Sequence, residues 1–189
     1  MARPLSPEKR EALLQSATQV VAEHGVLATT ASIAKRAGVA EGTLFTYFEN
    51  KEVLFQALYL HLKQALADAM MPGYPHQADF RLRIEHLFQS YIGWGLSNPS
   101  GRLAVSRLAA SGRLLDETRA QAMASFQDVA HMMERAVQSG VLVNAPMAFL
   151  YAIIERIADI TIESIEKEPA NAERYRQIGF HAAWRAITS

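Results

Sequence analysis

The sequence of 189 residues contains no cysteine. Disulfides, thiol nucleophiles, cysteine-ligated zinc sites and thiol redox sensors are therefore excluded. It also contains no apolar run approaching the ~18 residues of a membrane-spanning helix, and no charged start followed by an apolar stretch of the kind that marks a signal peptide. We accordingly expect no membrane partner and a cytoplasmic location.

The sequence also lacks an excess of either charge, with 19 Lys and Arg against 19 Asp and Glu. Residues 1–63 hold seven Lys and Arg against six Asp and Glu, a difference of only +1. Non-specific binding to nucleic acid should therefore be weak. Any affinity for DNA would depend on a few placed cations, backbone amides, helix N-termini and a second copy of the binding motif.

One stretch, from Thr29 to Tyr47, has the pattern of a helix-turn-helix. We expect Thr30 to cap its first helix and Gly38 to end that helix in the left-handed conformation. Only three residues then precede the second helix, which is expected from Glu41 to Phe48. Such a short connection containing glycine is typical of a helix-turn-helix.

The predicted outward face of the second helix suits duplex DNA. Hydroxyl groups can bond phosphate oxygens, and an aromatic ring or a threonine methyl can contact a thymine methyl. Gly42 allows close approach to a base edge, and Lys35 lies on the polar face of the first helix. Lys51 opposes the dipole of the next helix, so a phosphate partner would explain its presence. Leu44 and Phe48, which lie one turn apart, are expected to face inward. The outward residues are Thr43, Phe45, Thr46 and Tyr47.

Residues 7–60, and above all TT…IAKRAGVAEGTLFTYFENKEVL, resemble the N-terminal DNA-binding domain of the TetR family of transcriptional regulators. The resemblance implies phosphate contacts by Thr30, Thr46, Tyr47 and Lys51, and base contacts by Glu41, Gly42, Thr43 and Phe45. The sequence departs from the family pattern at two positions. Ala31 stands where the family can have a base-reading arginine, and Ala40 where it commonly has a serine cap. The second change should cost that helix roughly 0.5–2 kcal/mol.

Helical periodicity continues to the C-terminus, and we predict an all-α chain of about nine helices. Their expected limits are Ser6 and Gly25, Thr30 and Gly38, Glu41 and Phe48, Lys51 and Met71, Phe80 and Ser97, Asn98 and Gly112, Asp116 and Gly140, Asn144 and Pro169, and Ala170 and Ile187. The segment MMPGYPHQAD predicts a domain boundary. The expected parts are a three-helix DNA-binding domain at 1–50, with the motif at about 29–48, a connecting helix at 51–71, and a helical ligand-binding and dimerisation domain at 72–189. Arg3, Lys9 and Arg10 form either an arm on the DNA backbone or a solvated terminus.

The last two helices combine β-branched and small residues, which allow helices to approach closely. Two such helices from each chain would form a four-helix interface between the chains of a homodimer. The two recognition helices would then reach successive major grooves ~34–36 Å apart on an inverted repeat. The alternative is that this face packs within its own domain. The predicted pairing residues are Ile153, Ile157, Ile160, Ile178, Ala182, Ala183 and Ala186.

The middle helices are rich in methionine and aromatic residues, which form adaptable apolar pockets but are also common in ordinary cores. The segments LYLHLKQ, SYIGWGL and GFHAAWRA are similar to the RamR-type multidrug-responsive members of the family, which implies pocket residues Tyr59, Lys63 and Trp94. Asp159 belongs to an acidic row with Glu155 and Glu163. That row is either a solvated face or a charge that attracts lipophilic cations. The other predicted ligand-binding residues are Met70, Tyr91, Phe126 and Met133.

The function predicted from these features is a dimeric repressor, released from an inverted-repeat operator by a small lipophilic or cationic and amphipathic effector. A regulator or activator without an effector is one alternative. An all-α metal-binding enzyme is the other, because Asp128-x-x-His131 has metal-ligand spacing. A di-iron bundle needs that pair twice together with two further carboxylates. We therefore expect no enzyme, no metal and no cofactor.

Overall fold

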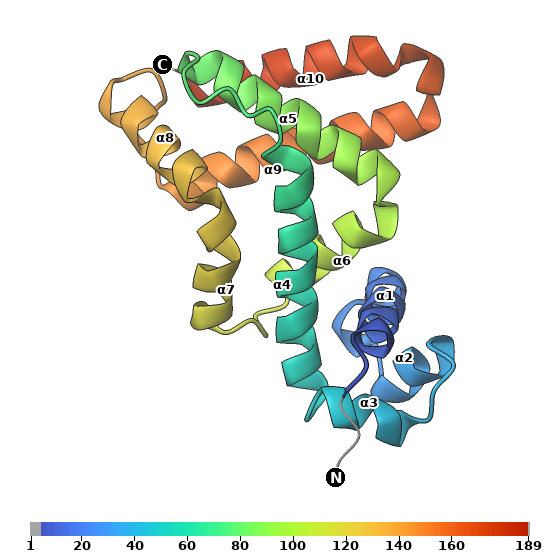
Figure 1. The fold of residues 1–189 in the computed structure, drawn as a ribbon. Helices are drawn as coiled ribbons and strands as arrows, with labels where there is room; N and C mark the ends of the chain where they lie inside the picture. Colours follow the sequence, from blue (N-terminus) through green and yellow to red (C-terminus); the bar gives the residue numbers. More distant parts are fainter. Residues whose placement is uncertain (1–4, 189) are drawn as a thin grey trace. The chain divides into compact units, whose positions relative to one another are not determined.

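A computed structural model describes residues 5–188 of the chain, and over this range it is entirely helical apart from turns and one isolated bridge between Leu142 and Thr188 (Figure 1). The predicted all-α class is confirmed. The α-helices are α1 Pro7–His24, α2 Thr30–Arg36, α3 Glu41–Tyr47, α4 Lys51–Met70, α5 Phe80–Ser97, α6 Pro99–Ala110, α7 Asp116–Met123, α8 Gln127–Gln138, α9 Met147–Lys167 and α10 Ala172–Ile187. Within this range, no helix is long and apolar enough to span a bilayer.

The main departure from the expected helices lies between Asp116 and Gly140, where one long helix was predicted. The chain instead forms α7, a 3₁₀ turn at Ala124–Phe126, and α8. No glycine or proline marks this break, and the spacing of the apolar residues continues across it. One expected start also differs, because α9 begins at Met147 rather than at Asn144, and neither α7 nor α9 has a side-chain cap.

The helices group into two compact units. One unit comprises Met1–Ala65 with Asn98–Ala124, and the other comprises Leu66–Ser97 with Ser125–Ser189. The first unit includes α6 because that helix packs along α1. The division between the units falls inside α4, before the segment rich in proline and glycine that the sequence indicated.

In the first unit, α1 supports the helix-turn-helix. The Ser6 hydroxyl accepts a hydrogen bond from the Lys9 amide, Pro7 occupies the first turn, and Gly25 ends the helix with φ 59°. The helix therefore has the limits expected at Ser6 and Gly25, with proline at its start and glycine at its end. The buried side of α1 faces α2 and α6. α1 therefore connects the helix-turn-helix to α6 through its buried side.

In the second unit, α5, α9 and α10 pack together (Figure 1). α9 and α10 approach each other closely, since a β-carbon added at Gly179 would stand 2.1 Å from the Thr161 hydroxyl oxygen. The end of α10 is held by the Val143 amide, which donates to the Ile187 carbonyl at 2.9 Å.

Candidate nucleic-acid interface and effector site

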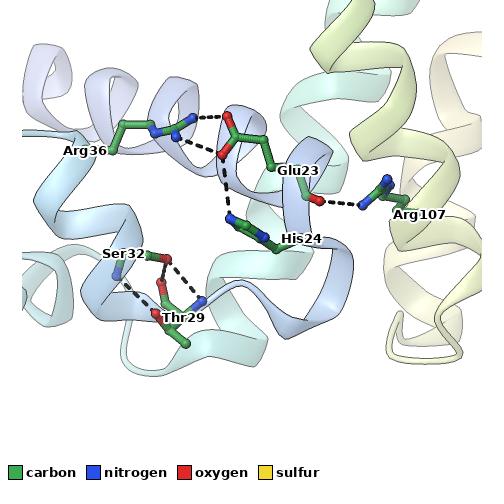
Figure 2. A network of polar contacts seen from close by, with 6 residues as sticks. All are labelled: Glu23, His24, Thr29, Ser32, Arg36 and Arg107. Atoms are coloured by element: carbon green, nitrogen blue, oxygen red, sulfur yellow. Dashed lines mark hydrogen bonds and ion pairs between the residues drawn. The ribbon is translucent and has the colours of Figure 1, made fainter.

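The helix-turn-helix begins with a capping box at Thr29, one residue before the predicted cap. The Thr29 hydroxyl accepts from the Ser32 amide at 3.1 Å, and the Ser32 hydroxyl accepts from the Thr29 amide at 3.3 Å (Figure 2). The prediction of Thr30 as the cap was wrong because two adjacent threonines satisfy the same local rule. Thr30 is instead the first helical residue of α2.

The turn between α2 and α3 has the conformation expected at Gly38. Gly38 has φ 68°, a value that favours glycine. The Val39 amide donates to the Ala34 carbonyl at 3.0 Å, and the Gly38 amide donates to the Lys35 carbonyl at 3.2 Å. This pair of bonds is a Schellman motif, and it fixes the direction in which the chain enters α3.

One side of α3 is buried and the other is open. Leu44 and Phe48 are buried, as predicted, and Ala40 precedes the helix without a side-chain cap. The residues of the open side are Glu41, Gly42, Phe45 and Thr46, which are exposed, and Thr43 and Tyr47, which are half-buried. The buried pair therefore holds α3 so that the predicted DNA-contacting side stays accessible.

The hydroxyls predicted to contact phosphate already have partners in the chain. Thr30 Oγ1 donates to Glu41 Oε1 at 2.6 Å, and Thr46 Oγ1 donates to the Thr43 carbonyl. The Tyr47 hydroxyl accepts from the Ser6 amide at 3.1 Å. Since the Tyr47 oxygen acts as an acceptor in this contact, its own proton remains available to a phosphate.

The predicted cationic contacts differ in their surroundings. Lys51 Nζ donates to the Val26 carbonyl at 2.8 Å and lies 5.2 Å from the Phe55 ring centre. An acceptor within the chain thus accounts for Lys51 without a phosphate, although an ammonium group has two further protons. Lys35 is exposed, with no ion pair among residues 5–188. Arg3 lies outside the described residues.

An ion-pair network missed by the sequence reasoning ties the motif to its support. Arg36 donates to both carboxylate oxygens of Glu23, at 2.6 and 2.8 Å, and Arg107 Nη1 donates to the Glu23 carbonyl at 3.1 Å (Figure 2). The hydrogen bond from Arg36 holds the pKa of the Glu23 carboxyl below its ordinary value. The network links α1, α2 and α6. Its residues lie too far apart in the sequence for a local pattern to reveal these contacts.

Three of the predicted effector residues come together in the second unit. The Tyr91 hydroxyl donates to Asp159 Oδ1 at 3.1 Å, and Arg156 Nη1 lies 3.6 Å from Asp159 Oδ2. Asp159 is only 8% exposed, so a fully solvated acidic row is wrong for this residue. The Trp94 ring centre lies 6.4 Å from that of Tyr91. The result is a buried carboxylate bonded to a tyrosine whose ring lies near a second aromatic ring.

The remaining predicted effector residues are divided between the units. Phe126 and Met133 are buried in the second unit, and Met70 is half-buried there. Tyr59 is buried and Lys63 half-buried on the part of α4 that belongs to the first unit.

The predicted pairing surface on α9 and α10 is largely open. Ile160 and Ile178 are 62% and 54% exposed, a large fraction for isoleucine. Ala183 is 0% exposed, and it therefore belongs to the packing within its own chain rather than to a surface. Of the other predicted residues, Ala182 and Ala186 are exposed, and Ile153 and Ile157 are half-buried.

In the part of the chain that the structure describes, no three His, Asp or Glu side chains gather as metal ligands would. His131, half of the acid–histidine pair, is exposed, while Asp128 Oδ2 lies 3.7 Å from His76 Nδ1.

Comparison with known proteins agrees with this geometry. Residues 13–58 match the family model described as "Bacterial regulatory proteins, tetR family". The nucleoid occlusion factor SlmA of Marinobacter nauticus is 27% identical over 136 residues, which span 71% of this chain and 69% of SlmA. The HTH-type transcriptional regulator YhgD of Bacillus subtilis is 37% identical over 76 residues, which span 38% of this chain and 40% of YhgD.

The structural similarity extends well beyond the matched domain. The crystal structure of a tetR family transcription regulator from Shewanella sp. PV-4 superimposes with a TM-score of 0.82 and 27% identity, over 96% of this chain and 98% of that one. Residues 13–58 therefore form a TetR-family DNA-binding domain, and the described chain has the fold of TetR family transcription regulators, which are not enzymes.

Proposed function

We propose that the protein is a dimeric repressor that inserts α3 into the major groove of an inverted-repeat operator. The open side of α3, held by the buried Leu44 and Phe48, is the observation that carries this proposal. The hydroxyls and the phenyl ring on that side suit phosphate oxygens and thymine methyls. The small net charge of the chain makes two copies of the motif necessary for useful affinity.

Dimerisation is supported by the exposed isoleucines of α9 and α10. Exposed β-branched residues on two neighbouring helices form an apolar surface that a second copy would cover isologously. Ile160 and Ile178 are the central residues of this proposed interface. Pairing through this face would give the two α3 helices one two-fold axis, which an inverted-repeat operator shares.

The effector proposed for this repressor is a small lipophilic cation. Its site includes Tyr91, Trp94 and Asp159, because aromatic rings beside a buried carboxylate attract cations by charge and by cation–π contact. The effector would compete with Arg156 for the second carboxylate oxygen. Since α4 contributes residues to both units, it is the direct covalent route from the effector unit to the helix-turn-helix. A typical coupling free energy is ~1–3 kcal/mol.

Selection of bound fragments from genomic DNA tests the first part of the proposal. The full-length protein should enrich one inverted repeat, and a panel of lipophilic cations should release it from that DNA. Asp159→Asn should weaken release by cations more than release by neutral amphiphiles of similar size. An enriched repeat that no compound releases would leave a DNA-binding regulator or activator without an effector.

Nucleoid occlusion is a second candidate, since the similarity to SlmA extends over 71% of this chain and so beyond the DNA-binding motif. Mapping of bound sites across the chromosome separates the two functions. A repressor should occupy a few promoters, and transcription from them should rise when the gene is deleted. A nucleoid occlusion factor should occupy many dispersed sites, with little change in transcription.

A further inference from the structure

The first residues of α2 and α3 are joined by a hydrogen bond in which Thr30 Oγ1 donates to Glu41 Oε1 at 2.6 Å. The distance is short, as expected when the acceptor is a carboxylate. The family resemblance assigned Thr30 to phosphate and Glu41 to bases. The contact assigns Thr30 a different task, because its only proton is directed at the carboxylate.

This hydrogen bond occupies one of the two carboxylate oxygens of Glu41 and leaves the other accessible. Glu41 is exposed, and its Oε2 has no hydrogen-bond partner within residues 5–188. The carboxylate lies at the start of α3, where the helix dipole favours a negative charge and where Ala40 supplies no competing cap. Oε2 is thus a fixed hydrogen-bond acceptor at the leading end of the proposed recognition helix.

The major-groove edges of the four bases respond differently to such an acceptor. Cytosine presents the N4 amino group alone, whereas adenine presents its N6 amino group beside the N7 acceptor. Guanine and thymine present the acceptors O6, N7 and O4, which repel a carboxylate. A carboxylate held in one orientation therefore favours cytosine and rejects guanine most strongly.

We propose that Thr30 is a positioning residue that holds Glu41 for the selection of cytosine at one base pair of each half-site. This inference rests on the proposed function, namely that α3 enters the major groove. One good base contact discriminates by about 1–3 kcal/mol, which corresponds to roughly 5- to 150-fold in affinity. For one carboxylate oxygen we expect the lower part of that range, about tenfold for cytosine over guanine.

Isosteric variants separate positioning from support. Thr30→Val preserves shape and removes the donor, so the cytosine preference should fall to about twofold, and Thr30→Ser should restore it. In Glu41→Gln, Thr30 still donates to the side-chain oxygen, which leaves the amide nitrogen outermost. That nitrogen is a donor, and the preference should turn from cytosine toward guanine.

The experiment selects bound sequences from a randomised DNA pool with the full-length wild-type protein and these three variants. The affinities for the four bases at the affected position are then measured by competition. The cytosine preference should be lost in Thr30→Val, recovered in Thr30→Ser and reversed in Glu41→Gln. The thermal unfolding temperatures of the four proteins should lie within a few degrees of one another. It is overturned if Glu41→Gln weakens binding to all four bases equally, or if Thr30→Val leaves the preference intact. A wild-type protein that enriches no sequence would instead overturn the proposed function, and this inference with it.

Discussion

Replacing Gly179 by alanine should destabilise the second unit, because α9 and α10 leave no room for a methyl group. The added carbon would lie 2.1 Å from Thr161 Oγ1, 3.1 Å from Thr161 Cγ2 and 3.2 Å from Thr161 Cβ. The buried Thr161 has little freedom to respond, since its hydroxyl donates to the Ile157 carbonyl at 2.7 Å. Either its rotamer changes and that bond is lost, or the two helices move apart.

The expected loss of unfolding free energy in Gly179→Ala has three contributions. Overpacking of a close contact costs typically 1–3 kcal/mol, and loss of the Thr161 hydrogen bond costs about 0.5–1.5 kcal/mol. Alanine in a helix interior recovers roughly 0.5–1 kcal/mol relative to glycine. Combined, these give a net loss of about 0.5–4 kcal/mol in the free energy of unfolding, measured by urea denaturation.

Gly93→Ala in α5 is the matched control, because no atom lies within 4 Å of its added carbon. It should leave stability unchanged or raise it by up to about 1 kcal/mol. The double variant Gly179→Ala with Thr161→Ala should recover part of the loss, since it removes the two closest atoms. If Gly179→Ala proved as stable as Gly93→Ala, the close contact between α9 and α10 would be refuted.

Three further predictions concern other contacts. Ile160→Asp, at an exposed position of the proposed pairing surface, should give a folded monomer in sedimentation where the wild type gives the proposed dimer. Tyr74→Phe removes the acceptor at 3.0 Å from the Nε of Arg83, which is 9% exposed, and should cost about 1–3 kcal/mol of unfolding free energy. Burial raises the pKa of the Tyr74 hydroxyl. The stability that the neutral Tyr74 side chain contributes is therefore complete below the ordinary pKa of tyrosine, and it should vanish as pH rises through the folded pKa. The pKa of Glu23 is lowered by its hydrogen bond from Arg36, so the stability from this contact is complete above the ordinary carboxyl pKa. It should be lost as pH falls through the folded pKa, and amide hydrogen exchange in α2 should then become faster.

Features governed by neighbouring residues were predictable from the sequence. Ser6 with Pro7, Gly25 and Gly38 each mark a helix end through a local rule, and the structure has all of them. The buried side of α3 also followed from spacing, because Leu44 and Phe48 lie one turn apart. Local rules lost precision at Thr29, whose neighbour has the same side chain, and at the start of α9, which follows Pro146 rather than Asn144.

Contacts between distant residues were not predictable. Tyr91 and Asp159 are 68 residues apart, and the Glu23 carbonyl and Arg107 are 84 apart. The burial of Asp159 depends on the packing of α5 against α9, which periodicity does not specify. The grouping of α6 with the N-terminal segment has the same origin, because it depends on the packing of α6 against α1.

The DNA affinity of Gly42→Ala tests most directly whether α3 approaches base edges closely. Gly42 is exposed, lies within a helix, and has no atom within 4 Å of an added β-carbon. Alanine should therefore leave stability unchanged or raise it by up to about 1 kcal/mol.

Affinity for the selected operator should nevertheless fall by roughly tenfold or more, the effect of losing about one specific base contact. Binding to random DNA and the behaviour of Gly93→Ala should stay at wild-type levels. Operator affinity in Gly42→Ala equal to that of the wild type would contradict the claim that the start of α3 reads the DNA.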